Sequence, residues 1–438
     1  MRLLKVREAA KTTFFFMRKW YSLYDKVYSH ANLMEAYKKV KANKGAAGID
    51  GISLTEFNKR KDKELCQLEK ELKTKTYQPQ AVKRVHIPKP DGSERPLGIP
   101  TVRDRVVQQA LLNVLQPIFD PDFHPSSYGY RPGRSCAQAV AKAERFSNKW
   151  GLNHVVDMDL SKCFDTLDQD LIIAGVQEKV SDGSVLHLIR QMLETGIMDK
   201  GIYESTTVGS PQGGVISPLL MNIYLDKFDQ YMKSQGIRIV RYADDILIFA
   251  RTRSEAGNYR HQATQYLEGE LKLTVNVRKT HLTTIWEGIA YLGFIITHRG
   301  VRIHPKSVKK FKEKIRKLTP RNSGQNVEMQ IGEVSQVMRG FANYFRIGQV
   351  KSLYKALMSW IRRRLRMKQM RAWKSWKAMH KQLRRLGYKG SFEKISMTRW
   401  RNASSKLIHM ALPNEWFSNL HLYNMEGVQT NTLHQYYE

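Results

Sequence analysis

Three aspartates are the residues of this sequence whose types and spacing point most directly to chemistry. Asp159 closes a short, mostly apolar run, and Asp244-Asp245 occupy the bend between two β-type runs, residues 237–241 and 246–250. Carboxylates gathered in one place repel one another unless cations neutralise them, and their hard oxygen atoms suit Mg²⁺. Two Mg²⁺ ions about 3.5–4 Å apart can activate an attacking hydroxyl and stabilise the leaving oxygen of a phosphoryl displacement. If the three aspartates converge, they are candidates for such a site.

The bend also has a plainer interpretation. An Asp-Asp pair is common in tight turns because aspartate hydrogen-bonds its own backbone there. Here the flanking residues are apolar on both sides, Ile239-Val240 before the bend and Ile246-Leu247-Ile248 after it. A second acid-tipped strand lies upstream, with Phe164 shortly after it. The combination favours a metal site over a plain turn.

The elements around these aspartates are predicted to be both strands and helices. Residues 82–87 alternate like a strand, turn at residues 88–92 and return through residues 95–100, which predicts a hairpin rich in cations. Strand-type and helix-type patterns alternate irregularly up to about residue 303, which indicates an α+β fold rather than a regular βαβ series. Beyond that point the pattern is helical, over residues 308–318, 327–345 and 351–370.

The charge balance predicts a polyanionic partner. The chain has 438 residues, with 73 Lys and Arg against 40 Asp and Glu, and a formal net charge of +33. A surplus of this size repels itself, and a nucleic acid would supply the counter-charge. Residues 301–400 alone hold 27 Lys and Arg and 4 Asp and Glu, with aromatic residues interleaved among them. These aromatic residues fit either base stacking or the helix core.

The composition argues against several other classes. The three cysteines, Cys66, Cys136 and Cys163, are too few for a disulfide framework and form no C-x-x-C pair. We therefore expect a reducing compartment and no zinc site. No apolar run reaches the ~20 residues of a membrane-spanning helix, so we expect a cytoplasmic protein with no membrane partner.

Short motifs in a fixed order along the chain carry a resemblance to a known family. They occupy residues 44–51, 86–92 with 95–100, 127–134, 156–160, 209–214 with 217–220, 242–245, 279–280 and 291–294. With these motifs, among them Tyr242-Ala-Asp-Asp245, the chain resembles a bacterial group II intron reverse transcriptase, or maturase. After residue 303, the runs 340–345 and 361–370 resemble the thumb, or X domain, of that family.

The resemblance implies a right-hand polymerase fold. Fingers and palm with an antiparallel sheet would cover residues 31–303, followed by an all-helical thumb (the maturase X domain) over residues 304–380. A basic N-terminal extension, residues 1–30, would precede them, and a small basic nucleic-acid-binding region, residues 381–438, would follow. Because no cysteine follows Cys163, we expect no Cys-pair endonuclease, a compact form that resembles the class C intron proteins.

The resemblance also implies roles for single residues. Asp159, Asp244 and Asp245 would be the catalytic acids that bind two Mg²⁺ ions, with the Leu160 carbonyl as a further ligand. The residues implied to bind the dNTP substrate are Lys89, Arg95, Phe164, Gln212 and Lys279. Those implied to bind template or intron RNA are Arg131, Arg134, Arg362, Arg363 and Arg364. From the residues alone, Phe164 also fits an ordinary core position, and the hairpin that carries Lys89 and Arg95 also fits a solvated turn.

The implied function is that of the RNA-directed DNA polymerase of a group II intron, which copies RNA into DNA by two-metal phosphoryl transfer and binds its intron RNA to assist splicing and mobility (retrohoming). Its partners would be the intron RNA, an RNA template paired with a DNA primer, and target DNA, in the bacterial cytoplasm and associated with the nucleoid. Two alternatives stay open: an RNA-binding maturase that only assists splicing, and a domesticated relative used in defence or repair. One departure from the family is Gln169, where relatives often carry histidine.

Overall fold

The computed structural model describes residues 19–88, 94–205, 208–209, 213–320, 324–373, 375–392 and 395–437. The chain forms two compact units, and each contains segments that are far apart in the sequence. Unit 1 consists of Met1–Arg134, Asp157–Ile248 and Gly257–His281. Unit 2 consists of Ser135–Val156, Phe249–Ala256 and Leu282–Glu438.

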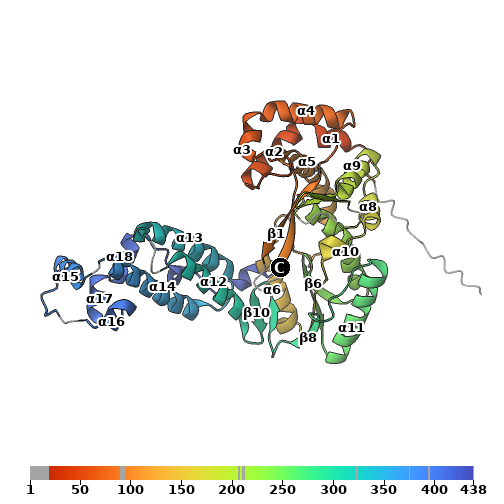
Figure 1. Ribbon diagram of the computed structural model, residues 1–438. Helices are drawn as coiled ribbons and strands as arrows, with labels where there is room; N and C mark the ends of the chain where they lie inside the picture. Colours follow the sequence, from red (N-terminus) through yellow and green to blue (C-terminus); the bar gives the residue numbers. More distant parts are fainter. Residues whose placement is uncertain are drawn as a thin grey trace, which may run out of the picture. The chain divides into compact units, whose positions relative to one another are not determined.

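Unit 1 begins with a group of helices (Figure 1). They are α1 (Tyr24–Tyr28), α2 (His30–Ala42), α3 (Leu54–Lys59), α4 (Lys61–Lys73) and α5 (Val102–Phe119). Apolar residues at helical spacing face the centre of the group, where Leu33, Leu65 and Leu68 are fully buried. Helix α2 is tied to α5 by Asn32, whose Nδ2 donates to the carbonyl of Ala110 at 3.0 Å.

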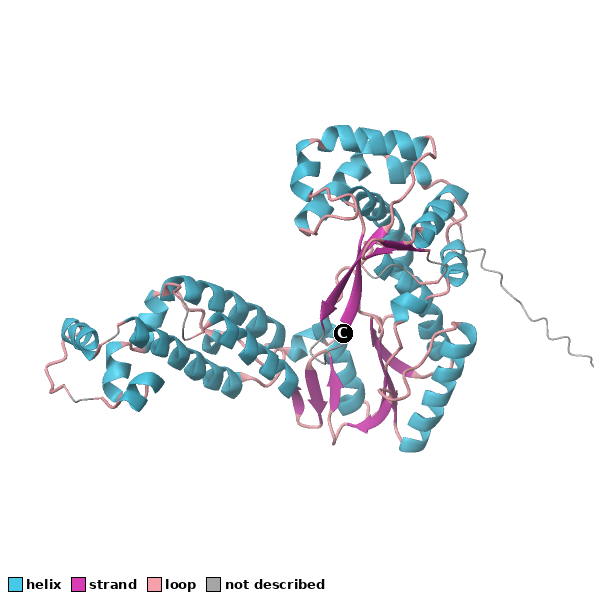
Figure 2. Ribbon diagram, in the orientation of Figure 1, coloured by secondary structure: helices cyan, strands magenta, loops and turns pink. Residues whose placement is uncertain are grey.

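A long hairpin belongs to a sheet with the strand order β2-β1-β4-β5 (Figure 2). Its strands are β1 (Val82–Pro88), β2 (Glu94–Ile99), β4 (Ile197–Asp199) and β5 (Ile202–Glu204). Strand β1 pairs antiparallel with β2, with Ile87 opposite Arg95, and parallel with β4. The two antiparallel strands of the hairpin predicted between residues 82 and 100 are therefore confirmed, whereas most of its predicted turn, residues 89–92, lies outside the described residues.

A second sheet has the strand order β6-β7-β3-β8. Its strands are β3 (His154–Met158), β6 (Arg238–Tyr242), β7 (Asp245–Ala250) and β8 (His281–Thr284). The helices of this part of the chain are α7 (Cys163–Thr166), α8 (Gln169–Gln177), α9 (Gly183–Glu194), α10 (Ser217–Ser234) and α11 (Arg253–Gln265). Residues 246–250 of β7 are all buried, which explains their apolar sequence. Because β7 lies between β6 and β3, residues at the start of β7 have neighbours on both of these strands.

Unit 2 contains α6 (Cys136–Glu144), a three-stranded antiparallel sheet and several long helices (Figures 1 and 2). The strands, in sheet order, are β11 (Gly300–Ile303), β10 (Phe294–Thr297) and β9 (Ile289–Tyr291). The long helices α12 (Pro305–Leu318), α13 (Val327–Phe345) and α14 (Lys351–Ala372) match the three predicted helical runs. Aromatic residues hold them together: Phe311 of α12 stacks on Phe341 of α13 with ring centroids 4.1 Å apart.

Four short helices complete unit 2. They are α15 (Trp376–Arg385), α16 (Met397–Asn402), α17 (Lys406–Ala411) and α18 (Asn414–Asn419). Met370 at the end of α14 shares a small apolar core with Met379, Leu383 and Ile408 of these helices. Of the tryptophans interleaved among the cations, Trp373 packs against this core, whereas Trp376 is exposed.

Candidate active site

The Asp-Asp bend is a tight turn between two strands of the second sheet. Strand β6 ends at Tyr242 and β7 begins at Asp245, so Ala243 and Asp244 form the turn. Ala243 has a φ of +58°. Two-residue hairpins commonly need positive φ angles, because such turns match the twist of the strands. The turn therefore holds its two carboxylates in a defined place.

A fully buried ion pair fixes this turn to helix α10. The Nε and Nη2 atoms of Arg241 both donate to the Asp229 carboxylate, and the Nη2–Oδ2 distance is 2.6 Å. The third guanidinium nitrogen, Nη1, donates to the Ala243 carbonyl and to Oδ1 of Asn222, each at 3.0 Å. A charge-assisted hydrogen bond to the carbonyl of Ala243 thus reaches the turn itself.

The glycine-containing loop at residues 126–131 braces the turn from another direction. The backbone N–H of Arg241 donates to the carbonyl of Ser126, and that of Tyr128 donates to the carbonyl of Arg241, both at 2.9 Å. A Cβ atom on Gly129 would lie 2.3 Å from the backbone nitrogen of Ala243, so only glycine fits there. This explains why a motif more than 100 residues upstream belongs to the site.

We expect Gly129→Ala to lower primer extension by about 10²-fold, because the added methyl group pushes against the backbone of the turn and a displacement of ~1 Å misplaces reacting groups. Single-nucleotide incorporation rates measure the effect. Gly257→Ala on α11 is the control, because its Cβ would meet nothing within 4 Å. Equal rates for both variants would show that the contact at Gly129 does not position the site.

The structure brings Asp159 close to the turn. Asp159 follows β3 directly, and β3 is the neighbour of β7. Asp245 is exposed at the start of β7, but the protein around its carboxylate partly desolvates it, and this raises its pKa above the usual value for aspartate. The negative charges of Asp244, Asp157 and Asp159 raise the pKa of Asp245 further, to about 6. Four carboxylates from two neighbouring strands therefore share one electrostatic environment.

One of these acids, Asp157, was missed by the sequence reasoning. Burial raises its pKa to about 6, the charge of Asp159 adds to the increase, and His281 opposes it from 3.8 Å. Side chains two positions apart on a strand point to the same face. That spacing was the available signal, because Asp157 and Asp159 are residues i and i+2 of one strand-type run.

Asp159 is held by hydrogen bonds and an ion pair. Its backbone N–H donates to Oγ1 of Thr280 at 3.2 Å, and its carbonyl accepts from the N–H of Asn276 at 2.8 Å. The ammonium group of Lys279 lies 3.6 Å from Oδ2 of Asp159. The segment at residues 276–280 therefore fixes the Asp159 backbone and brings a cation to its carboxylate.

The carbonyl of Leu160 points away from the adjacent segment. Leu160 and Val275 form an antiparallel bridge, and the hydrogen bonds around it run from Ser161 to Thr274 and from Asn276 to Asp159. In this arrangement the bridged residues themselves direct their N–H and C=O groups outward. This orientation is compatible with the metal-ligand role predicted for the carbonyl.

The donor atoms of the site suit a magnesium ion whose coordination shell is completed by waters and by the substrate. Among the described residues, no group of three or more His, Cys, Asp or Glu side chains forms a ready-made metal site. Mg²⁺ is usually bound by one or two carboxylates together with waters and substrate phosphates, not by a full protein cage. Asp244, Asp157 and Asp159, whose charges raise the pKa of Asp245, are donors whose repulsion such an ion would relieve.

The residues predicted to bind the nucleotide are only partly described. Phe164 lies in α7 and is 8% exposed. Arg95 lies in β2, where its backbone pairs with Ile87. Lys89 and Gln212 lie outside the described residues.

The structure corrects the prediction that Arg131 binds template phosphates. Its guanidinium is buried, with the side chain 4% exposed. Nε donates to Asp120 at 2.8 Å, and Nη1 donates to the carbonyls of His124 and Ser127. Arg131 therefore holds its own loop together. Arg134 of the same loop is half-buried, with its guanidinium over the ring of Tyr128 at 5.5 Å.

The three consecutive arginines of α14 differ in their surroundings. Arg362 is paired with Glu426 at 2.9 Å, and Arg364 donates to Thr319. Arg363 is exposed, and its Nε donates to the Asn402 carbonyl at 3.3 Å. Of the three, Arg363 is thus the one most accessible to a phosphate.

Comparison with known proteins relates this site to a family. Residues 87–296 match the family described as "Reverse transcriptase (RNA-dependent DNA polymerase)", and residues 308–387 match "Group II intron, maturase-specific domain". Protein YkfC of Escherichia coli is 36% identical over 309 residues, which cover 62% of this chain and 80% of YkfC. The chain belongs to the group II intron reverse transcriptases. Its fold is that of a right-hand polymerase, and its enzyme class is RNA-directed DNA polymerase.

Other relatives of this reverse transcriptase are longer. The group II intron-encoded protein LtrA of Lactococcus lactis subsp. cremoris is 34% identical over 245 residues, 55% of this chain and 40% of LtrA. The putative COX1/OXI3 intron 2 protein of Saccharomyces cerevisiae is 28% identical over 327 residues, 60% of this chain and 37% of that protein. The reverse transcriptase thus spans less than half the length of these two relatives.

Solved structures show more distant similarity. An apo telomerase from Candida tropicalis, truncated from its C-terminal domain, aligns with a TM-score of 0.40 and 15% identity over 58% of this chain and 61% of that one. A chain of a partial Cas6-RT-Cas1–Cas2 complex aligns with a TM-score of 0.36 and 22% identity over 57% of this chain and 43% of that one. Within the described part of the reverse transcriptase, the helices are too short or too polar to cross a membrane.

Proposed function

We propose that this reverse transcriptase copies intron RNA into DNA by two-metal phosphoryl transfer at Asp159, Asp244 and Asp245. The observation that supports the proposal is the shared electrostatic environment of these acids, in which the pKa of Asp245 rises to about 6. Anions held so close together bind a divalent cation favourably, because the cation relieves their repulsion.

The residues of the metal site would each have a distinct role. Asp244 and Asp245, on the braced turn, and Asp159, at the end of β3, would hold two Mg²⁺ ions with the Leu160 carbonyl. When bound, such ions lower the pKa of the primer 3′-hydroxyl and stabilise the leaving oxygen of the pyrophosphate. Lys279, whose ammonium group lies 3.6 Å from Oδ2 of Asp159, would contact the nucleotide phosphates. Arg241 and Gly129 would keep the turn in place, because both contact its backbone rather than its carboxylates.

Residues outside the metal site would select and hold the nucleotide. Phe164 would lie under the incoming sugar and exclude a 2′-hydroxyl, while Lys89, Arg95 and Gln212 would contact the triphosphate and the nucleotide. We expect Phe164→Ala to admit ribonucleotides, because the volume that the ring fills becomes available to the extra hydroxyl. The ratio of dNTP to rNTP incorporation by the same preparation measures this. A variant with a lowered unfolding temperature and an unchanged ratio would show that Phe164 is only a core residue.

The cationic helices of unit 2 would bind RNA. Lys312 and Arg316 of α12 and Arg364 of α14 all lie within 6 Å of the Trp360 ring centroid. Three cations around one ring give a concentrated positive surface, which phosphates would neutralise. Arg134 and Arg363 would add further phosphate contacts. Through this surface the protein would bind its intron RNA and the RNA–DNA duplex, assist splicing and support mobility into target DNA.

Primer extension on an RNA template, compared with splicing of the parent intron, tests the proposed function. The proposed function predicts that the wild-type protein performs both activities and that primer extension depends on Asp244 and Asp245. A protein that assists splicing but never extends a primer would instead be a splicing-only maturase. The division into residues 1–30, 31–303, 304–380 and 381–438 stays a prediction, which expression of the separate parts would test.

A further inference from the structure

A cavity of about 800 Å³ lies between helices α12 and α13 of unit 2. Its volume falls within the range of sites that bind small ligands. Every residue that lines it belongs to one of these two helices, so the cavity lies entirely within unit 2.

The walls of the cavity are partly aromatic. Phe311 of α12 and Phe341 of α13 line it and stack on each other. Tyr344 lines it as well; its hydroxyl donates to the carbonyl of Leu292 at 2.9 Å, and its ring stacks on Phe294 with centroids 5.6 Å apart. Tyr344 is nevertheless 42% exposed. The ring is therefore held in place while part of it stays accessible, as in proteins that stack unpaired bases on aromatic side chains.

Two lysines of α12 line the same cavity. Lys310 and Lys314 are four residues apart, so they lie on one face of the helix, and both are exposed. Within the described part of the chain, neither ammonium group makes an ion pair. The acidic residue among the lining residues, Glu333, accepts a hydrogen bond from Gln325 at 3.1 Å. The cavity thus has a positive wall on α12, which phosphates would neutralise.

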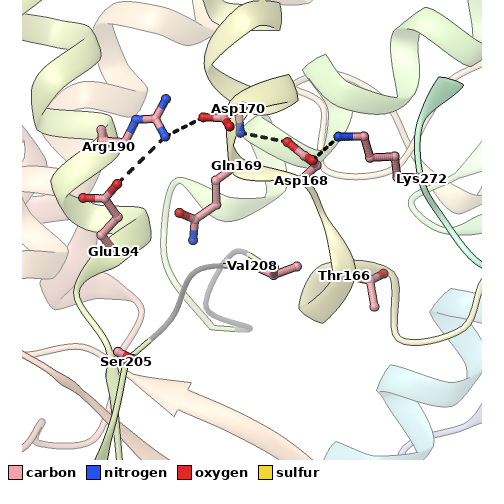
Figure 3. Close-up of a pocket in the computed structure, with 9 residues that line it drawn as sticks. All are labelled: Thr166, Asp168, Gln169, Asp170, Arg190, Glu194, Ser205, Val208 and Lys272. Atoms are coloured by element: carbon pink, nitrogen blue, oxygen red, sulfur yellow. Dashed lines mark hydrogen bonds and ion pairs between the residues drawn. The ribbon is translucent and has the colours of Figure 1, made fainter.

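The pocket drawn in Figure 3, in unit 1, differs in both respects. Lys272 pairs with Asp168 at 2.6 Å and Arg190 with Asp170 at 2.7 Å, so the two cations that line it are already neutralised. None of the residues drawn there is aromatic. The cavity of unit 2 therefore suits a nucleotide better than this pocket does.

Gly340 leaves room in the cavity of unit 2. It lies in the interior of α13 and lines the cavity, and an added Cβ would meet nothing within 4 Å. Glycine in a helix interior lowers helix stability relative to alanine, and neither a positive φ nor a close contact requires it here. A side chain at this position would lie over the preceding turn, toward Gln336 and Val337, which also line the cavity. The glycine thus keeps open a space that a larger side chain would fill.

We propose that the cavity between α12 and α13 binds one unpaired nucleotide of a bound RNA, with its base against Tyr344 and its flanking phosphates near Lys310 and Lys314. The inference rests on the proposed function, in which the cationic helices of unit 2 bind RNA. It adds that this RNA is recognised by an extruded base as well as by its backbone charge.

A nucleotide fits the cavity better than an acidic peptide does. The lysines match any polyanion, but an accessible aromatic ring beside them matches the π-face of a base. The surroundings of α12 agree with a nucleic acid, because Lys312 and Arg316 of the same helix lie near the Trp360 ring of α14. A strand that crosses α12 would therefore meet cations on the side of α14 as well as in the cavity.

Three RNAs of otherwise identical sequence test the inference: a fully paired duplex, the duplex with one bulged nucleotide, and the bulged duplex with that nucleotide made abasic. Fluorescence anisotropy gives the Kd of each for the full chain. The bulged duplex should bind the wild type about tenfold more tightly than either of the others, which is the effect of one stacked base. The abasic RNA separates the base itself from the flexibility of a bulged backbone.

Gly340→Leu should remove this preference, because its side chain would fill the cavity. The affinity for the paired duplex should change less than about twofold, since no charge is altered. Gly332→Leu is the matched control: Gly332 is also an exposed interior glycine of α13 whose Cβ would meet nothing within 4 Å, but it does not line the cavity. This variant should keep the preference. Both substitutions raise helix propensity, so both variants should fold.

Lys310→Gln combined with Lys314→Gln should weaken binding of the bulged duplex. The slope of log Kd against log salt concentration should flatten by roughly 1.5, because two phosphate contacts are lost. Lys309→Gln combined with Lys317→Gln is the control, because it removes the same charge from exposed positions of α12 outside the cavity. The control should keep the preference for the bulged duplex.

Equal binding of the three RNAs by the wild type would overturn the inference and favour a peptide as the occupant of the cavity. A preference that Gly340→Leu leaves intact, or that Gly332→Leu removes equally, would also overturn it. If Gly340→Leu does not fold, the two lysine variants still decide the question. A wild type that binds none of the three RNAs would instead contradict the RNA binding proposed for unit 2.

Discussion

We expect the replacement of both Asp244 and Asp245 by asparagine to lower cDNA synthesis by at least about 10³-fold, while RNA binding and folding should be retained. Asparagine keeps the size of each side chain and removes the negative charges that would hold the metal ions. Loss of metal-stabilised charge in the transition state costs several kcal/mol, and each 1.4 kcal/mol is about tenfold in rate. Primer extension measures the loss, and a filter-binding titration with intron RNA measures what is kept.

The matched control is Asp62→Asn, on the exposed side of α4, for which we expect no change in extension. The unfolding temperature of the double variant should equal or exceed that of the wild type, because the mutual repulsion of the four carboxylates is relieved. If cDNA synthesis survived in the double variant, these acids would not hold the metal. If RNA binding disappeared as well, the turn would belong to the RNA surface.

The second large effect concerns stability. Asp229→Asn should lower the free energy of unfolding by about 3–5 kcal/mol, because it leaves the fully buried Arg241 guanidinium without its counter-charge. The rate of primer extension should fall at the same time, since Arg241 also holds the Ala243 carbonyl of the turn. Urea unfolding monitored by circular dichroism gives the difference in free energy.

An exposed ion pair provides the comparison. Asp170 is paired with Arg190 at 2.7 Å, but its side chain is 82% exposed, so Asp170→Asn should cost no more than about 1 kcal/mol. A cost below 1 kcal/mol for Asp229→Asn would mean that the buried guanidinium finds another partner. The anchoring of the turn by Arg241 would then need a different explanation.

Much of the fold could be predicted from local patterns. The hairpin between residues 82 and 100 and the helices α12 to α14 have clear periods of two and of about 3.6 residues. The Asp-Asp bend was recognisable because its flanks are apolar. Such features are determined by residues that are close together in the chain, so a single sequence is enough to predict them.

The contacts that fix the site could not be predicted in the same way. Arg241 is held by hydrogen bonds to Asp229 and Asn222, and the turn that it contacts also packs against Gly129. These residues lie far apart in the sequence, and only the tertiary fold brings them together. Arg131 shows the opposite failure: its motif suggested an exposed cation, but the fold buries it against Asp120. Burial is a property of the whole structure, and a motif alone does not show it.

Asp157 and Gln169 are intermediate cases. The spacing of Asp157 from Asp159 already placed both on one face of a strand, so a stricter use of the strand period would have included Asp157. Gln169 was visible as a departure from the family, but its hydrogen bond to Gly209 became clear only in the structure.

One measurement tests the central claim most directly: extension of a DNA primer on a poly-ribonucleotide template by the wild-type protein and by Asp159→Asn, with Mg²⁺ and with the metal removed by a chelator. Asp159 is the decisive residue because it follows β3, whereas Asp244 and Asp245 belong to the hairpin of β6 and β7. We predict extension by the wild type only when Mg²⁺ is present, and none by the variant under either condition. Extension that continues without a divalent ion, or that Asp159→Asn leaves intact, would contradict a metal site shared between the end of β3 and the Asp-Asp turn.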